Sequence, residues 1–296
     1  METPEQVLRR LEFKVVRRLD GFLFGDYSGI FYGPSLDLAE VREYQPGDEV
    51  RRIDWNVTAR LNRLFVRQYR EERELTAWLV VDRSPSMTFG TRRQLKRDTA
   101  TEFAAVAAYI VTRHGDKIGL MTFPGRTAFV PPRGGRTHVL RILHALSRTE
   151  PDGPGGDLAE SLQFAARGLR RRSLVFLVSD FLSEGDWQRP LMELARRHDL
   201  IAVWVHDPAE FELPDVGGMH VEDTETGERL WVDTSDPRIR EAYRQLVAQH
   251  REHVHTVCRG AKVDVLELST AQPLVTALLH FVTLRKRRRR WSLPGR

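Results

Sequence analysis

The chain of 296 residues is long enough for one or two domains, and its composition, 41% hydrophobic and 29% charged, is that of an ordinary globular protein. A single cysteine, Cys258, excludes an internal disulfide framework and a four-cysteine zinc site. No apolar run approaches the roughly 20 residues that span a bilayer, and the first residues lack the apolar stretch of a secretory signal. We therefore expect a cytoplasmic protein.

The net charge of +5 arises from the end of the chain. Residues 285–296 carry seven basic side chains and no acid, whereas the rest of the chain is close to neutral. The folded part therefore lacks the basic excess typical of nucleic-acid-binding domains. We expect residues 285–296 to form a basic, disordered tail. Its run Arg285–Arg290 followed by Trp291 is compatible with binding to nucleic acid or, more specifically, with peripheral contact with an anionic membrane.

The first 73 residues predict a helix followed by a small β-rich domain. Apolar residues recur at helical spacing over residues 5–20, so residues 1–20 are assigned to an N-terminal helix. Residues 21–73 contain short alternating segments typical of strands at 27–32, 50–55 and 64–69. Pro46 and Gly47 occupy the centre of a predicted turn between them.

Residues 74–284 predict an α/β domain. Apolar strands are expected at 75–81, 117–123, 127–130, 173–179, 200–205 and 262–266. Helices are expected at 93–113, 136–147, 157–169, 186–197, 237–259 and 270–284, with an edge hairpin at 221–232. Because the strands lack polar alternation and are separated by helices, we expect a doubly wound, mainly parallel sheet with helices on both faces.

Polar side chains follow two of the predicted strands directly. Asp82, Ser84 and Ser86 follow the strand at 75–81, and Asp180 follows the strand at 173–179. Ligands of open α/β sheets gather beyond the carboxyl ends of the strands, so these oxygens are expected to converge there. Carboxylates with hydroxyls suit Mg²⁺ or Mn²⁺, which keep some of their water and accept a ligand from a partner. The alternative is that these side chains only satisfy backbone groups at the strand ends.

At these residues the chain resembles a von Willebrand factor A-like domain with a metal-ion-dependent adhesion site (MIDAS). Together with the segments REYQPGD at 42–48, RRIDW at 51–55 and Ala59-Arg60, it resembles the bacterial domain of unknown function 58 (DUF58) family over residues 20–270. The resemblance implies a non-enzymatic adaptor that uses a divalent cation to capture an acidic group of a protein partner. It also implies a MoxR-type AAA+ ATPase as that partner.

One position departs from the adhesion-site pattern. Gly156 stands where the pattern has a threonine ligand. The next residue, Asp157, can supply a replacement ligand, directly or through water, or it can cap the helix that follows. Asp157 is therefore included as a fifth candidate ligand.

The segment from residue 42 to residue 60 is rich in charged and aromatic side chains. It is either a docking surface for the partner or a brace between the β-rich domain and the α/β domain. The candidate partner-binding residues are Arg42, Tyr44, Asp48, Arg51, Asp54, Trp55 and Arg60.

His250, His253, His255 and Cys258 lie on one predicted helix. A helix puts His250 and His253 on one face and His255 elsewhere, so we expect solvated histidines rather than a zinc site. Cys258 is expected to be a small apolar filler, because no activating base is apparent near it.

A metal-dependent phosphohydrolase with Asp82 as nucleophile is the enzymatic alternative. This chemistry usually needs an acid or proton donor two positions later and a nearby lysine. Position 84 is serine, and no lysine is expected to face Asp82. The sequence therefore favours a binding module without a small-molecule substrate.

Overall fold

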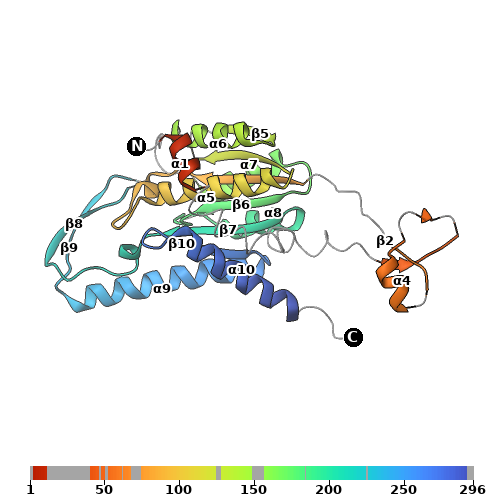
Figure 1. Ribbon diagram of the computed structural model, residues 1–296. Coiled ribbons are helices and arrows are strands. Elements are labelled where there is room, and N and C mark those ends of the chain that lie inside the picture. The colour runs from red at the N-terminus through yellow and green to blue at the C-terminus, as the bar shows by residue number, and fades with distance from the viewer. Residues whose placement is uncertain are drawn as a thin grey trace.

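The computed structural model describes residues 3–11, 41–46, 48–50, 53–61, 63–67, 75–124, 128–148, 157–183, 185–224 and 226–291. A six-stranded sheet forms the centre of the larger domain (Figure 1). Its strands are β3 (Thr76–Asp82), β4 (Lys117–Phe123), β5 (Phe129–Arg133), β6 (Leu174–Ser179), β7 (Asp199–His206) and β10 (Asp264–Ser269).

The sheet is mainly parallel, as predicted. Its spatial order is β10-β7-β6-β3-β4-β5, and only the edge strand β5 runs antiparallel to its neighbour β4. Strand β3 is the first strand of this sheet in the sequence. It lies in the interior of the sheet, between β4 and β6. The order therefore reverses beside β3, and this is where doubly wound sheets bind ligands.

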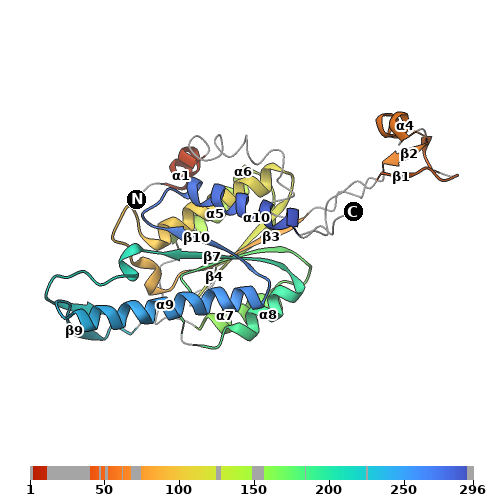
Figure 2. The same cartoon turned by 90° about the horizontal axis from the view of Figure 1, so that it is seen from below.

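Helices cover both faces of the sheet (Figure 2). One face carries α1 (Pro4–Leu11), α5 (Lys96–Arg113), α6 (Arg136–Arg148) and α10 (Leu274–Trp291), and the other carries α7 (Leu158–Gly168), α8 (Gln188–Arg197) and α9 (Pro237–Gly260). Successive side chains of a strand alternate between faces. In β3, Leu79 packs into the first core, while Trp78 and Val80 pack into the second.

The end of the chain differs from the prediction. Helix α10 runs to Trp291, so the predicted disordered tail begins as a continuation of this helix. At the boundary, Arg285 forms an ion pair of 2.9 Å with Asp264 of β10. Residues 292–296 lie outside the described residues. Among the helices of the described residues, none combines the length and apolar character needed to cross a membrane.

Two short elements and a hairpin complete the larger domain. The 3₁₀ helices are η3 (Pro85–Thr88), after β3, and η4 (Pro208–Glu210), after β7. Strands β8 (Gly218–Glu222) and β9 (Arg229–Asp233) form the predicted antiparallel hairpin. The prediction that this hairpin lies at an edge of the large sheet is wrong, because it forms a separate two-stranded sheet.

Among the residues before 75 that the structure describes, β1 (Val41–Glu43) pairs with β2 (Phe65–Arg67) in an antiparallel arrangement, and α4 (Trp55–Leu61) is a helix. The predicted strand at 50–55 is wrong: Ile53 makes only an isolated bridge to Val66, and the helix starts two residues later. The predicted turn is present, with the Asp48 amide donating to the Gln45 carbonyl at 3.0 Å. The expected strand at 27–32 lies outside the described residues. Figures 1 and 2 show α4 and β2 away from the large sheet.

Candidate functional site

The ends of the neighbouring parallel strands β3 and β6 bring together polar residues that are far apart in the sequence. Ser86, in η3, donates its hydroxyl hydrogen to Asp180, which follows β6, at 2.7 Å. The hydroxyl oxygens of Ser84 and Ser86 lie 3.0 Å apart in a hydrogen bond. A continuous chain of hydrogen bonds therefore links Ser84, Ser86 and Asp180, as the convergence of strand ends predicted.

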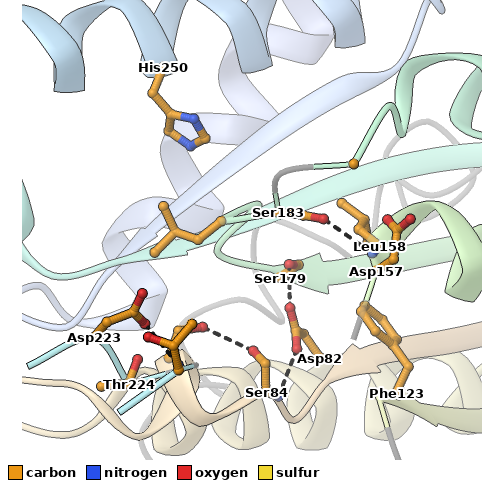
Figure 3. Close-up of a pocket in the computed structure, with 14 residues that line it drawn as sticks. Asp82, Ser84, Phe123, Asp157, Leu158, Ser179, Ser183, Asp223, Thr224 and His250 are labelled. Atoms are coloured by element: carbon orange, nitrogen blue, oxygen red, sulfur yellow. Dashed lines mark hydrogen bonds between the residues drawn. The ribbon is translucent and has the colours of Figure 1, made fainter. Parts of the chain in front are cut away.

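Asp82 is the last residue of β3 and is only 5% exposed. One carboxylate oxygen accepts the backbone N–H of Ser84 at 2.8 Å, and the other accepts the hydroxyl of Ser179 at 2.5 Å (Figure 3). Burial and the neighbouring charge of Asp180 raise the pKa of Asp82 to about 7, although its hydrogen bonds oppose the shift. The folded environment therefore favours the protonated form of the Asp82 carboxyl more than water does.

The backbone turns sharply after Asp180. Phe181 has a φ of 58°, in the left-handed region that non-glycine residues rarely adopt. Its side chain is fully buried and packs on Trp187 at 5.4 Å between ring centroids, and its N–H donates to the Ser179 hydroxyl at 2.9 Å. This packing holds a costly backbone conformation that directs the chain away from the strand end immediately after the acid.

Lys96, at the start of α5, lies against Asp180. The prediction from the sequence concerned only a lysine facing Asp82 and did not include this contact. Its side chain is 0% exposed and its ammonium donates to Asp180 at 2.7 Å and also to Glu210. Burial alone would lower the pKa of Lys96, but the two carboxylates raise it. The charge of Asp180 is therefore compensated inside the protein, whereas Asp82 has no cation bonded to it among the described contacts.

A third strand-end acid, Asp207 after β7, anchors the neighbouring loops. It accepts hydrogen bonds from the Thr91 amide at 2.8 Å, the Thr91 hydroxyl at 2.7 Å and the Thr270 hydroxyl. Although burial opposes the change, these bonds lower the pKa of Asp207 to about 2. Sequence reasoning missed this residue, which a search for acids within two positions of the end of the predicted strand at 200–205 would have found.

An open pocket of about 660 Å³ lies over the ends of β3 and β6 (Figure 3). Among the described residues, its lining includes three of the predicted site residues from the β3 end together with Asp157, but neither Asp180 nor Lys96. The lining is Asp82, Ser84, Ser86, Phe123, Asp157, Leu158, Ser179, Leu182, Ser183, Gly185, Asp223, Thr224, Thr226 and His250.

Asp157 caps helix α7, which was one of its two predicted roles. Its carboxylate accepts the Ala159 amide at 2.8 Å, and the same side chain lines the pocket. Gly185 lies against it so closely that a β-carbon there would come within 2.3 Å of a carboxylate oxygen. A larger residue at position 185 would therefore require the Asp157 side chain to move. Gly156, at the position of the missing threonine, lies outside the described residues.

The three helix histidines do not behave alike, and the prediction that all are solvated is wrong for His250. This residue is half-buried and lines the pocket. Its ring packs edge-on against Trp204, with 6.3 Å between the ring centroids. His253 is exposed, and His255 lies 3.1 Å from Glu267. Cys258 is fully buried in the core as expected, and burial raises the pKa of its thiol to about 12.

The predicted partner-binding residues belong to the small β1–α4–β2 unit. Trp55 is 65% exposed at the start of α4, Tyr44 is half-buried and Arg60 is exposed. Asp48 accepts the Gln45 amide at 2.9 Å, and Asp54 accepts the Val57 amide at 3.2 Å at the N-terminus of α4. Arg42 lies in β1, but its side chain and the whole of Arg51 lie outside the described residues.

Within the described residues, no group of three or more His, Cys, Asp or Glu side chains is arranged to hold a metal. A cation here would instead depend on one carboxylate, serine hydroxyls and water, which is the donor set of a hydrated Mg²⁺ or Mn²⁺. The oxygens that face the pocket and the raised pKa of Asp82 fit such an ion.

A family described as protein of unknown function DUF58 matches residues 40–253. The chain belongs to this family. The uncharacterized protein Rv1480 of Mycobacterium tuberculosis is 40% identical over 284 residues, which cover 95% of this chain and 89% of that protein.

Two solved structures are similar to this chain. BatB of Bacteroides thetaiotaomicron is 14% identical, with a TM-score of 0.44, over 72% of this chain and 99% of that one. The SpRpn10 VWA domain is 12% identical, with a TM-score of 0.39, over 70% and 94%. In this DUF58 chain, the strand order and the two helical layers described above form the expected von Willebrand A-like fold.

Proposed function

We propose that the chain is a non-enzymatic protein-recognition module that captures an acidic group of a protein partner through a divalent cation, Mg²⁺ or Mn²⁺. Asp82, Ser84 and Ser86 would hold the ion, and Asp157, on the same pocket, is a further contributor. When bound, the cation would supply positive charge that attracts a carboxylate. The observation that carries the proposal is the pocket lined by Asp82 and both serines.

The hydroxyl hydrogens of the site support this assignment. Ser86 donates to Asp180, so in its bond with Ser84 the hydrogen comes from Ser84. Both hydrogens therefore point along the chain toward Asp180. The hydroxyl oxygens of Ser84 and Ser86, rather than their hydrogens, are therefore available to a cation.

The charges around Asp82 and Asp180 support different roles for these two acids. Asp180 is paired with Lys96 and bonds Ser86, so in this proposal it orients a hydroxyl and does not carry the ion's charge. Asp82 faces the pocket, and its raised pKa reflects a charge that a cation would stabilise.

Calorimetric titration with MgCl₂ and MnCl₂ tests the ion site. We expect saturable binding by the wild type, none by Asp82→Asn, and unchanged binding by Asp199→Asn, whose acid pairs with Arg172 at the opposite end of β7 from Asp207. Absence of binding to both ions by the wild type would refute the proposal.

A MoxR-type AAA+ ATPase is the partner that the family resemblance implies. Co-purification from a lysate of the native organism, with Mg²⁺ or with EDTA, tests this part of the proposal. We expect the ATPase to be retained in Mg²⁺ and lost both in EDTA and with Asp82→Asn. Retention of the ATPase irrespective of the metal would show that capture does not use this site.

The phosphohydrolase alternative requires a cation of the protein beside the phosphoryl group. Lys96 is fully buried between Asp180 and Glu210 and does not line the described pocket, so it is poorly placed for this task. We expect no Mg²⁺-dependent hydrolysis of p-nitrophenyl phosphate. Hydrolysis that disappears with Asp82→Ala would favour the enzyme.

Membrane or nucleic-acid contact through the C-terminal charges is separable from partner capture. Deleting residues 286–296 spares the ion pair between Arg285 and Asp264. We expect this deletion to leave Mg²⁺-dependent partner capture intact. Loss of capture would instead favour a function of the C-terminal charges.

A further inference from the structure

The pocket has a second polar wall, which does not come from the segment that carries Asp82, Ser84 and Ser86. His250 reaches the pocket from helix α9, whereas Asp82 and Ser84 belong to the β3 end (Figure 3). Thr224 and Thr226, on the turn between β8 and β9, also line it. A ligand held at Asp82 therefore meets groups from separate parts of the fold.

His250 is held in place but lacks a hydrogen-bond partner at one nitrogen. Its ring packs edge-on against the buried Trp204. Its Nε2 is buried from solvent and has no hydrogen-bond partner among the residues that the structure describes. A buried polar atom without a partner costs free energy, so it calls for a physical explanation.

The size of the pocket indicates what kind of ligand can reach both walls. A volume of about 660 Å³ lies within the range of pockets that enclose a drug-sized molecule. This is much more than a single carboxylate group needs. Apolar side chains, Phe123, Leu158 and Leu182, also line the pocket. A short peptide segment has both the length and the mixed chemistry to fill this space.

We infer that His250 is a second binding contact for the captured partner. The ligand is an acidic peptide segment: its carboxylate lies at the Asp82 end, and another of its polar groups forms a hydrogen bond with the imidazole of His250, which lines the pocket. This inference rests on the proposed function. It adds a specificity contact, because a lone carboxylate ion lacks a second oxygen far enough away to reach helix α9.

The probe is an immobilised library of octapeptides with a fixed central glutamate, with a matched glutamine library as control. The best glutamate peptide is then measured by fluorescence anisotropy in millimolar MgCl₂. His250→Phe keeps an aromatic ring against Trp204 and removes the nitrogens, whereas His250→Gln places an amide N–H near the position of Nε2. His253→Phe is the matched control, because His253 is exposed and is not among the residues that line the pocket.

We expect the wild type and His253→Phe to bind equally, His250→Phe to bind about 3- to 10-fold more weakly, and His250→Gln to recover most of the loss, as expected for one hydrogen bond. In a complementary NMR measurement, the His250 ring resonance is expected to shift on peptide addition. Equal affinity of His250→Phe and wild type, with an unmoved His250 resonance, overturns this inference alone. Failure of the wild type to prefer the glutamate library in Mg²⁺ refutes the proposed function as well.

Discussion

Replacing Asp82 by asparagine should change how the stability of the metal-free protein depends on pH. The pKa of Asp82 is raised to about 7 by burial and by the charge of Asp180, whereas an aspartate in the unfolded chain titrates near 3.8. Well below pH 3.8 the carboxyl is protonated in both states, and its ionisation costs the fold nothing. Between pH 3.8 and about pH 7, Asp82 has lost its proton in the unfolded chain but retains it in the folded chain. The free energy of unfolding therefore falls as pH rises from about 4 to about 7.

The structure gives the size of this effect. A shift of about three pKa units, at about 1.4 kcal/mol per unit, amounts to about 4 kcal/mol over the full titration. Asparagine has no ionisable group, so Asp82→Asn lacks this slope. Between pH 4.5 and pH 8, the stability of the variant relative to the wild type should rise by about 3 kcal/mol.

Urea unfolding of both proteins in EDTA, followed by circular dichroism at several pH values, measures this difference. Other titrating groups, such as the buried histidines, are common to both proteins and largely cancel. Adding MgCl₂ at pH 8 should stabilise the wild type but not the variant, since a cation favours the ionised carboxylate. A stability difference that does not change with pH would refute the reasoning about Asp82.

Three further changes test other parts of the structure. Lys96→Met should destabilise the fold by about 3–5 kcal/mol in urea unfolding, because it leaves buried carboxylates without their cation, whereas Lys262→Met, at an exposed position, should have little effect. Gly185→Ala should displace the acid that caps α7 and lower stability by about 1 kcal/mol, whereas Gly260→Ala, with open space around it, should not destabilise. Trp55→Ala should weaken partner capture and leave the melting temperature unchanged if this exposed ring is part of a docking surface; a lower melting temperature would favour the brace.

The larger fold could be predicted because its signals are local. Each inner strand is a continuous apolar run, so β4 and β6 appear in the sequence almost at their observed limits.

The error at residues 50–55 has a physical reason. Asp54 accepts the Val57 amide and so starts α4, and this capping outweighs the alternating pattern around it.

The site could be predicted only in part. Asp82 and Ser84 belong to one short motif, and the parallel register of β3 with β6 brings Asp180 near them. Lys96 is separated from Asp180 by 84 positions and from Glu210 by 114, and its helix begins with no feature that marks its first residue as buried. Such partners follow from how the elements pack, which no local pattern contains.

Lys96 also explains why the two acids of the site differ. Asp180 has the ammonium of Lys96 within hydrogen-bond distance in the folded protein. Asp82 is bonded to a hydroxyl and an amide instead, which stabilise its charge less than an ammonium does. The fold therefore compensates the acid that lies behind the pocket and leaves undercompensated the one that lines it. In the proposed function, a solvated cation in the pocket offsets the charge of Asp82. Its binding is favoured because burial of that charge destabilises the metal-free protein.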